Sequence, residues 1–173
     1  MTLKTLTLSL LLPLLLATTA GATQAQSDSP STRPTLSGHT SRGEELDLAQ
    51  WRGQVVLVYL WSTDCPVCLD RLPELRRNLA GWRGRPFVIV AVNQDTRMAD
   101  FKAYEQALDA VSPPAPQMKL VWRRDPAHRD NLGDQPVRQP TTLLLNRDGV
   151  LVKEVRGGWP AGTWDEIAEL VLN

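Results

Sequence analysis

The chain is poor in the residues that build metal centres. It has two cysteines, Cys65 and Cys68, and two scattered histidines, His39 and His128. A structural zinc ion takes four such ligands. We therefore expect no metal site and no cofactor, and we expect both histidines on the surface.

An excess of charge of one sign is also absent. Lysine and arginine together number 19, and aspartate and glutamate together number 19. No basic stripe indicates nucleic acid and no acidic tail indicates disorder, so the balance favours protein partners met one at a time. Four arginines of one polar stretch are interpreted as a solvated face: Arg123, Arg124, Arg129 and Arg138.

The apolar run near the N-terminus is too short for a membrane-spanning helix, which needs ~20 residues. It covers residues 6–17, follows Lys4 and precedes the small residues Ala20-Gly21-Ala22. This order predicts a cleaved export signal over residues 1–22, with cleavage after Ala25 as the alternative. A retained anchor is the other possibility, and no cysteine near the cleavage site indicates a lipoprotein.

Export predicts a periplasmic protein, without stable membrane insertion once the signal is cleaved. Disulfides persist in that compartment. Residues 23–34 are rich in Ser, Thr, Pro and Gln, which is typical of a flexible leader. Residues 35–173 suit one domain with a hydrophobic core.

The predicted elements alternate as in an α/β domain. Residues 35–48 are expected to form a small N-terminal hairpin, followed by a single turn over 48–54. The remaining elements follow from apolar runs and helical periodicity: strands 55–60, 87–92, 118–122, 141–146 and 150–155, and helices 66–79, 99–111 and from Thr163 onward. Residues 123–137 are expected to be mostly turns. Two βα units followed by an antiparallel hairpin predict a central mixed sheet with helices on both faces.

Two helix starts are marked by their sequence. If Cys65 is the N-cap of the first helix, Pro66 falls on the first helical position, where its missing N–H is harmless. The N–H of Cys68 then points back at the Cys65 sulfur. Thr163 is expected to cap the last helix, with Glu166 completing a capping box.

The cysteine pair lies where a buried strand turns into this amphipathic helix. A thiolate on Cys65 would receive the Cys68 N–H and the positive end of the helix dipole. The favoured interpretation is redox exchange. A structural disulfide and one half of a metal site, for example for Cu(I), remain as alternatives.

The sequence pattern is not limited to the C-x-x-C pair, and three segments of the chain contribute to it. They are Leu46-x-Leu48-x-x-Trp51-Arg52-Gly53-Gln54 with the following strand, Trp61-x-x-x-Cys65-x-x-Cys68-x-x-x-x-Pro73, and Gln139-Pro140-Thr141 through Gly149. Together and in this order they resemble the exported thioredoxin-like reductases of the TlpA/ResA type, a redoxin group similar to AhpC/TSA. That group includes cytochrome c maturation thioredoxins.

The resemblance implies a thioredoxin-like fold with an N-terminal β-hairpin extension. It implies that Cys65 is the nucleophile and Cys68 the resolving thiol. It also implies a cis Gln139–Pro140 bond beside Cys65, where a substrate peptide would bind. The partners would be protein dithiols or disulfides and an upstream membrane or periplasmic electron donor.

The chain departs from the family pattern at three positions. Asp64 stands where the family usually has Trp, Tyr59 where many thioredoxins have a buried acid, and Arg71 where haem-maturation members tend to have an acid. A carboxylate beside Cys65 disfavours its thiolate and favours a stronger reductant. One hypothesis is that Asp64 replaces the missing acid as a proton relay.

Pro66 and Val67, between the cysteines, are expected to modulate the pair, together with Trp61, Tyr59 and Asp64. Trp61 is expected to pack beneath it. The sequence thus predicts a periplasmic thiol–disulfide oxidoreductase that reduces partner disulfides. Its alternatives are a copper-handling or assembly factor that binds Cu(I) through both cysteines, and a disulfide oxidase or isomerase.

Overall fold

The computed structural model describes residues 33–133 and 139–173. The predicted signal over 1–22 and nearly all of the predicted leader lie outside these residues. The described elements, in chain order, are β1 Leu36–His39, β2 Glu45–Asp47, the one-turn 3₁₀ helix η1 Leu48–Trp51, β3 Val55–Trp61, α1 Pro66–Gly81, β4 Phe87–Asn93, α2 Met98–Val111, β5 Met118–Trp122, β6 Arg129–Asp130, β7 Thr141–Leu145, β8 Leu151–Arg156 and α3 Thr163–Leu172.

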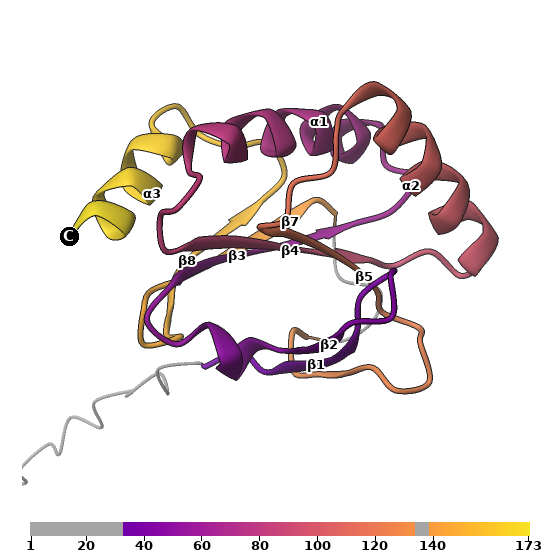
Figure 1. Ribbon diagram of the computed structural model, residues 1–173, viewed down its shortest axis with the longest axis horizontal. Helices are drawn as coiled ribbons and strands as arrows, with labels where there is room; N and C mark the ends of the chain where they lie inside the picture. Colours follow the sequence, from indigo (N-terminus) through magenta and orange to yellow (C-terminus); the bar gives the residue numbers. More distant parts are fainter. Residues whose placement is uncertain (1–32, 134–138) are drawn as a thin grey trace, which may run out of the picture.

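A five-stranded mixed sheet with the order β5-β4-β3-β7-β8 forms the centre of the molecule (Figure 1). Strands β3, β4 and β5 run parallel, and β7 pairs antiparallel with β3 and with β8. Val58 marks the register, because it lies opposite Val90 on one side and Leu143 on the other. All seven residues of β3 are buried, as expected for a central strand covered on both faces.

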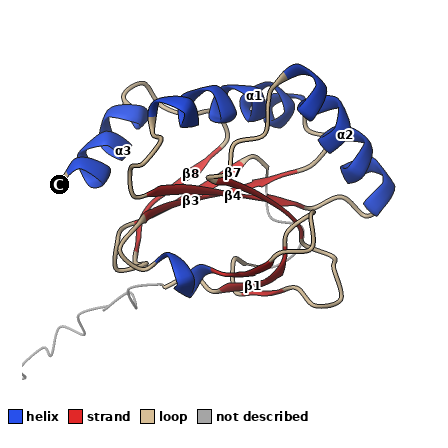
Figure 2. Cartoon of the chain, viewed as in Figure 1, coloured by secondary structure: helices blue, strands red, loops and turns tan. Residues whose placement is uncertain are grey.

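The two faces of the sheet are covered by different structures (Figure 2). Alternate residues of β3, including Leu57 and Tyr59, pack in one core with residues of α1, α2 and α3. The residues between them, including Val56 and Val58, pack in a second core with residues of β1, β2 and η1. All three α-helices therefore lie on one face.

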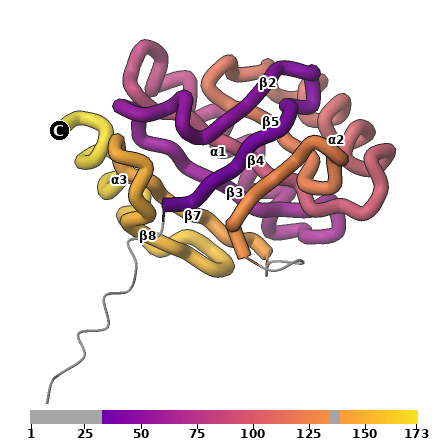
Figure 3. The backbone as a smooth tube through the Cα atoms, turned by 90° about the horizontal axis from the view of Figure 1, so that it is seen from below, coloured from indigo at the N-terminus to yellow at the C-terminus, as the bar shows by residue number. Residues whose placement is uncertain are grey.

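The predicted α/β class, the thioredoxin-like mixed sheet and the N-terminal hairpin are confirmed. The second face differs from the expectation of helices on both faces, because in the part of the chain that the structure describes only the one-turn helix η1 packs there. The hairpin β1–β2 and the short strand β6 form a three-stranded sheet there, with the order β2-β1-β6. Viewed from this side, the N-terminal segment crosses in front of the central sheet (Figure 3).

One short strand was not predicted. The stretch 123–137, expected to be mostly turns, consists mainly of turns and irregular structure over its described residues, but it also contains β6, which pairs with β1 through Leu36–Asp130 and Ser37–Arg129. Two residues carry no periodicity, so this strand exists only because β1 supplies a partner.

In the described part of the chain, no helix is long and apolar enough to cross a membrane.

The predicted capping box of α3 is wrong. The N-cap is Gly162 in the left-handed conformation, with φ of 84°, and no side chain caps the helix there. The Thr163 hydroxyl donates instead to the Pro160 carbonyl at 2.8 Å, and Glu166 forms an ion pair with Lys153. Glycine adopts positive φ without steric cost, which lets the chain turn into α3 one residue earlier than predicted.

Candidate active site

Cys65 and Cys68 form a disulfide at the start of α1. The S–S distance is 2.03 Å and the Cα atoms are 5.2 Å apart. Cys65 is the N-cap and Pro66 the first helical residue, as predicted. The Cys68 N–H reaches the Cys65 carbonyl at 2.9 Å and the Cys65 Sγ at 3.2 Å. The helix terminus therefore directs both a hydrogen bond and its positive dipole end at the Cys65 sulfur.

Burial distinguishes the two cysteines. Cys65 is partly exposed, whereas Cys68 is 0% exposed. Pro66 and Val67 between them are both exposed, Val67 at 54%. A reactant coming from solvent therefore meets Cys65 first, beside an apolar surface made by the two intervening residues.

Tyr59 and Trp61 lie beneath the disulfide at the end of β3 and are fully buried. The ring of Trp61 packs against Phe101 and Tyr104 of α2, with centroids 6.2 and 5.1 Å away. Trp61 therefore belongs to the core cluster that also contains Cys68.

The hydroxyl of Tyr59 donates to the backbone carbonyl of Cys68 over 3.4 Å. Burial raises the pKa of Tyr59 well above its usual value. Because a phenol with a raised pKa stays protonated at neutral pH, it is a poor substitute for the buried carboxylate of other thioredoxins.

The Gln139–Pro140 segment directly precedes β7, the strand that pairs with β3. Its peptide bond is cis, and the Pro140 carbonyl accepts the Gly157 N–H at 2.7 Å. The Gln139 side chain contacts the hydroxyl of Ser62, which lies in the turn between β3 and α1. The fold thus brings Gln139 to the turn that carries Cys65, although 74 positions separate the two in the sequence.

Asp64 is exposed, and its carboxylate accepts a hydrogen bond from Ser62. Ser62 itself is buried and was not recognised from the sequence. A serine between a tryptophan and a threonine carries no signal of its own, because its two partners lie on different segments.

Asp95 is a second residue that sequence reasoning missed. It is 7% exposed and lies just beyond the end of β4. Its carboxylate accepts the Thr63 N–H at 2.8 Å and the side-chain N–H of Asn93 at 2.9 Å. Sites in such sheets form beyond the carboxyl ends of parallel strands, so the polar residues after β4 were the signal for this contact.

Arg71 faces the loop before α3. Its guanidinium binds the Glu74 carboxylate at 2.5 Å and lies over the Trp159 ring at 5.2 Å. Trp159 packs on Trp164 with centroids 5.1 Å apart, and its indole N–H donates to Thr142 at 2.9 Å. This cluster connects α1 with β7 and with the first turn of α3.

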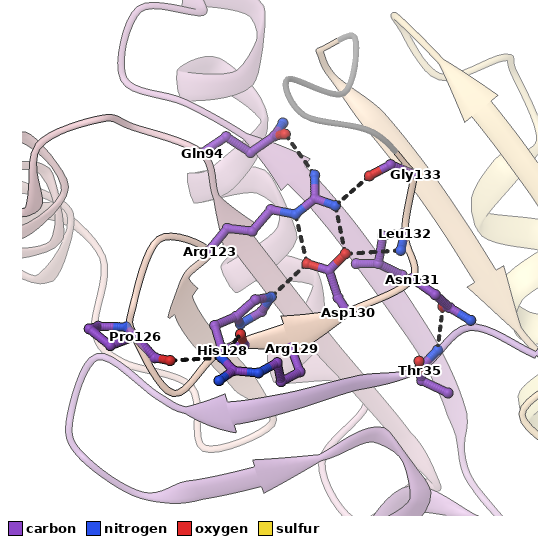
Figure 4. Close-up of polar contacts among 10 residues, drawn as sticks. All are labelled: Thr35, Gln94, Arg123, Pro126, His128, Arg129, Asp130, Asn131, Leu132 and Gly133. Carbon is purple, nitrogen blue, oxygen red and sulfur yellow. Dashed lines mark hydrogen bonds and ion pairs between the residues drawn. The ribbon is translucent and has the colours of Figure 1, made fainter.

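A polar cluster holds the chain between the end of β5 and Gly133 (Figure 4). Arg123 binds Asp130 through two hydrogen bonds of 2.7 and 2.6 Å, and His128 binds the same carboxylate at 2.7 Å. Arg123 also donates to Gln94 at 3.1 Å and to the Gly133 carbonyl at 2.8 Å.

The positions of Arg123 and His128 correct two expectations. Both residues are buried, although the sequence predicted a solvated arginine face and a surface histidine. Arg124 and Arg129 are exposed as expected, His39 is partly exposed, and Arg138 lies outside the described residues. A buried cation needs a paired anion, and Asp130 provides it.

Burial favours protonation of Asp130, but the hydrogen bonds from His128, Arg123 and the Leu132 N–H outweigh this effect. They hold the pKa of that carboxyl well below its usual range. Among residues 33–133 and 139–173, no group of three or more His, Cys, Asp or Glu side chains is arranged to hold a metal ion.

Comparison with known proteins supports a redox site. The chain is 26% identical to the thiol–disulfide oxidoreductase ResA of Halalkalibacterium halodurans, over 75% of this chain and 69% of that protein. It is 25% identical to the sporulation thiol–disulfide oxidoreductase A of Bacillus subtilis, over 98% of this chain and 99% of that protein.

A solved structure shows the same fold. The thiol:disulfide interchange protein of the thioredoxin family from Chlorobium tepidum superposes with a TM-score of 0.60 at 19% identity, over 81% of this chain and 94% of that one. The profile of the AhpC/TSA family matches residues 31–154, which include the disulfide and the cis-proline segment. The chain therefore belongs to the AhpC/TSA family and is a thiol–disulfide oxidoreductase with a thioredoxin-like fold.

Proposed function

We propose that this protein is a periplasmic reductase of protein disulfides in which Cys65 is the nucleophile and Cys68 the resolving thiol. The observation that carries the proposal is the asymmetry of the pair. Cys65 is partly exposed and accepts the Cys68 N–H at the helix terminus, whereas Cys68 is fully buried. Thiolate character and access together select the attacking sulfur.

The reduction consists of two exchange steps. The Cys65 thiolate attacks one sulfur of the substrate disulfide, and the other substrate sulfur leaves as a thiolate that takes up a proton. The Cys68 thiolate then attacks Cys65 Sγ in the mixed disulfide, which releases the second substrate thiolate. The substrate gains two electrons and the Cys65–Cys68 disulfide forms. A dithiol on a membrane or periplasmic partner must return those electrons.

Gln139 and Pro140 are proposed as the platform for the substrate peptide. Pro140 has no N–H, so the backbone groups available for pairing belong to the residue before it. The contact between Gln139 and Ser62 supports this role, because it keeps Gln139 next to the turn that carries the nucleophile.

The exposed carboxylate of Asp64 supports the reducing direction. A negative charge next to Cys65 disfavours the thiolate, and so makes the reduced pair a better electron donor. The periplasmic location rests on the proposed order of a signal over 1–22, a leader over 23–34 and one domain over 35–173.

Trapping a substrate tests the assignment of the two thiols. A Cys68→Ala variant is expected to accumulate mixed disulfides through Cys65, because the resolving thiol is missing. A Cys65→Ala variant with an intact Cys68 is the matched control and is expected to trap none. Equal trapping by both variants would contradict the assignment.

A measured reduction potential tests the direction. We expect a value well below the ~−120 mV of the oxidant DsbA, in the range of about −200 to −270 mV that thiol reductants occupy. A potential near that of DsbA would instead identify an oxidase.

A further inference from the structure

Three side chains from two chain segments meet beside the disulfide. Ser62 and Asp64 lie in the turn between β3 and α1, and Gln139 lies directly before Pro140 and β7. The Ser62 hydroxyl contacts a carboxylate oxygen of Asp64 and the side-chain oxygen Oε1 of Gln139. Ser62 is 3% exposed, so this contact forms in the interior edge of the site.

The chemistry of the three groups gives the contact a direction. One hydroxyl carries one proton and accepts through its lone pairs. Its proton goes to the Asp64 carboxylate, because a hydrogen bond to a charged acceptor is the stronger one. The amide of Gln139 completes the chain when its NH₂ group faces Ser62, an orientation reached by a half-turn of the amide.

We propose that Ser62 is a positioning residue that couples Asp64 to Gln139 and thereby sets the substrate-peptide platform beside Cys65. This inference rests on the proposed platform role of Gln139. It assigns a function to a residue that touches neither sulfur, and it makes Asp64 an acceptor within a hydrogen-bond chain.

The surroundings of the chain make the link effective. On one side, Asp95 holds the Thr63 N–H at 2.8 Å, and the Cys65 N–H reaches the Ser62 carbonyl at 3.4 Å. On the other side, Gly157 holds the Pro140 carbonyl at 2.7 Å. Ser62 thus connects two anchored segments. With its side chain held by Ser62, Gln139 keeps its backbone in one place for an extended peptide.

This role separates two kinds of substrate. A disulfide within a peptide needs both Cys65 and the backbone of Gln139, whereas a small aromatic disulfide needs only the sulfur. The first experiment therefore compares kcat/KM for a disulfide-bonded peptide with the rate for 5,5′-dithiobis(2-nitrobenzoate), in the wild type, Ser62→Ala and Ser62→Thr.

Ser62→Ala is expected to lower the ratio of the peptide rate to the small-disulfide rate by about fivefold to tenfold, mainly through KM, because the hydrogen bond between Ser62 and Gln139 is lost. Ser62→Thr retains the hydroxyl and is expected to recover most of the ratio. The control Thr63→Ala removes a neighbouring hydroxyl outside the chain and is expected to keep the wild-type ratio. Equal loss with both substrates in Ser62→Ala would overturn the proposal.

Asp64→Asn distinguishes positioning from proton transfer. Asparagine still accepts the Ser62 proton but cannot carry one between sulfurs. We expect it to keep most of the substrate ratio and to shift the pH–rate profile toward lower pH without changing its shape, because the charge beside Cys65 is removed. A profile that loses an ionisation step in Asp64→Asn, while Ser62→Ala leaves the substrate ratio intact, would assign Asp64 to the proton relay and overturn the coupling.

A spectroscopic measurement tests the chain without any substrate. The side-chain NH₂ signals of Gln139 in an ¹⁵N NMR spectrum are identified by their loss in Gln139→Ala. Both Ser62→Ala and Asp64→Ala are expected to shift them, the second through Ser62. Unchanged signals in both variants would refute the chain even in an active enzyme. Inactivity of the wild type toward both disulfides, with the shifts present, would refute only the proposed function.

Discussion

Gly149 sits at the tip of the β7–β8 hairpin in the left-handed conformation, with φ of 69°. Its N–H closes the turn by donating to the Asn146 carbonyl at 2.8 Å. An added Cβ would fall 1.3 Å from the guanidinium of Arg52, which itself donates to the Asp148 carbonyl at 2.5 Å. A Cβ atom at position 149 would therefore conflict with both the left-handed backbone conformation and the contact between Arg52 and Asp148.

Gly149→Ala is expected to lower the free energy of unfolding by about 1–2 kcal/mol, since L-residues disfavour this conformation and Arg52 must move. The measurement is urea unfolding of the variant beside Gly81→Ala. Gly81 ends α1 and has open space around it, so alanine there is expected to be neutral or to stabilise by up to about 1 kcal/mol. Equal losses in the two variants would contradict the conformational explanation.

At the scale of elements, the short strand β6 depends on one buried ion pair. The side chains of Arg123 and Asp130 are 1% and 5% exposed. Arg123 follows β5 and Asp130 lies in β6, so their pair joins the central sheet to the three-stranded sheet. His128 and Gln94 complete the contacts.

Asp130→Asn is expected to destabilise the fold by about 3 kcal/mol or more, because it leaves the Arg123 charge buried without its anion. Chemical unfolding at pH 7 measures this loss. Asp100→Asn is the matched control, since its partner Arg97 has a 73% exposed side chain and surface pairs contribute about 0.2–1 kcal/mol. A loss in Asp130→Asn no larger than in the control would rule out a supporting role for the buried pair.

Acid is expected to remove the stabilisation that Asp130 provides. The folded-state pKa of this carboxyl lies below the ordinary value of 3.8, so the unfolded chain binds the proton more readily. The stabilisation is therefore complete above about pH 5 and is lost as the pH falls below 4 toward the folded-state pKa. Unfolding curves at pH 7, 5, 4 and 3 are expected to show wild type and Asp130→Asn converging below pH 4. A constant difference over this range would contradict the assignment.

At the scale of the whole molecule, redox state and stability are linked. The difference between the unfolding free energies of the oxidised and reduced forms equals the difference between the redox free energies of the cysteine pair in the folded and unfolded chain. A difference of 1.4 kcal/mol corresponds to about 30 mV. The difference in stability between the two forms therefore gives the difference in reduction potential of the Cys65–Cys68 pair between the folded and the unfolded chain.

If the protein is a reductase, the oxidised form is expected to be the more stable one. A chain-entropy estimate for so short a ring is about 2 kcal/mol. Urea unfolding with and without dithiothreitol measures the difference, and a Cys65→Ala/Cys68→Ala variant, which lacks the pair, is expected to show none. A reduced form more stable than the oxidised one would match the behaviour of an oxidant such as DsbA, and would contradict the proposed direction.

The features that sequence analysis predicted correctly depend on neighbours in the chain. The run from Val55 and the leucines after Cys68 identified β3 and α1, because strand and helix periodicities are local. The N-cap at Cys65 followed from Pro66 alone. The α3 cap was missed at the same local scale, since Gly162 and Thr163 both suit a helix start and only the backbone conformation distinguishes them.

The order of the main strands and helices, the helix start at the cysteines and the fold family could be predicted from the amino-acid sequence. The shared face of the α-helices, the burial of Arg123 and His128 and the contact between Ser62 and Gln139 across 77 positions depend on the folded chain. Periodicity and capping act over a few residues, whereas these contacts depend on which strands pair and which segments then lie side by side. The position of Cys65 at the helix N-cap could be predicted from neighbouring residues, whereas the side chains around it are brought together by the tertiary fold.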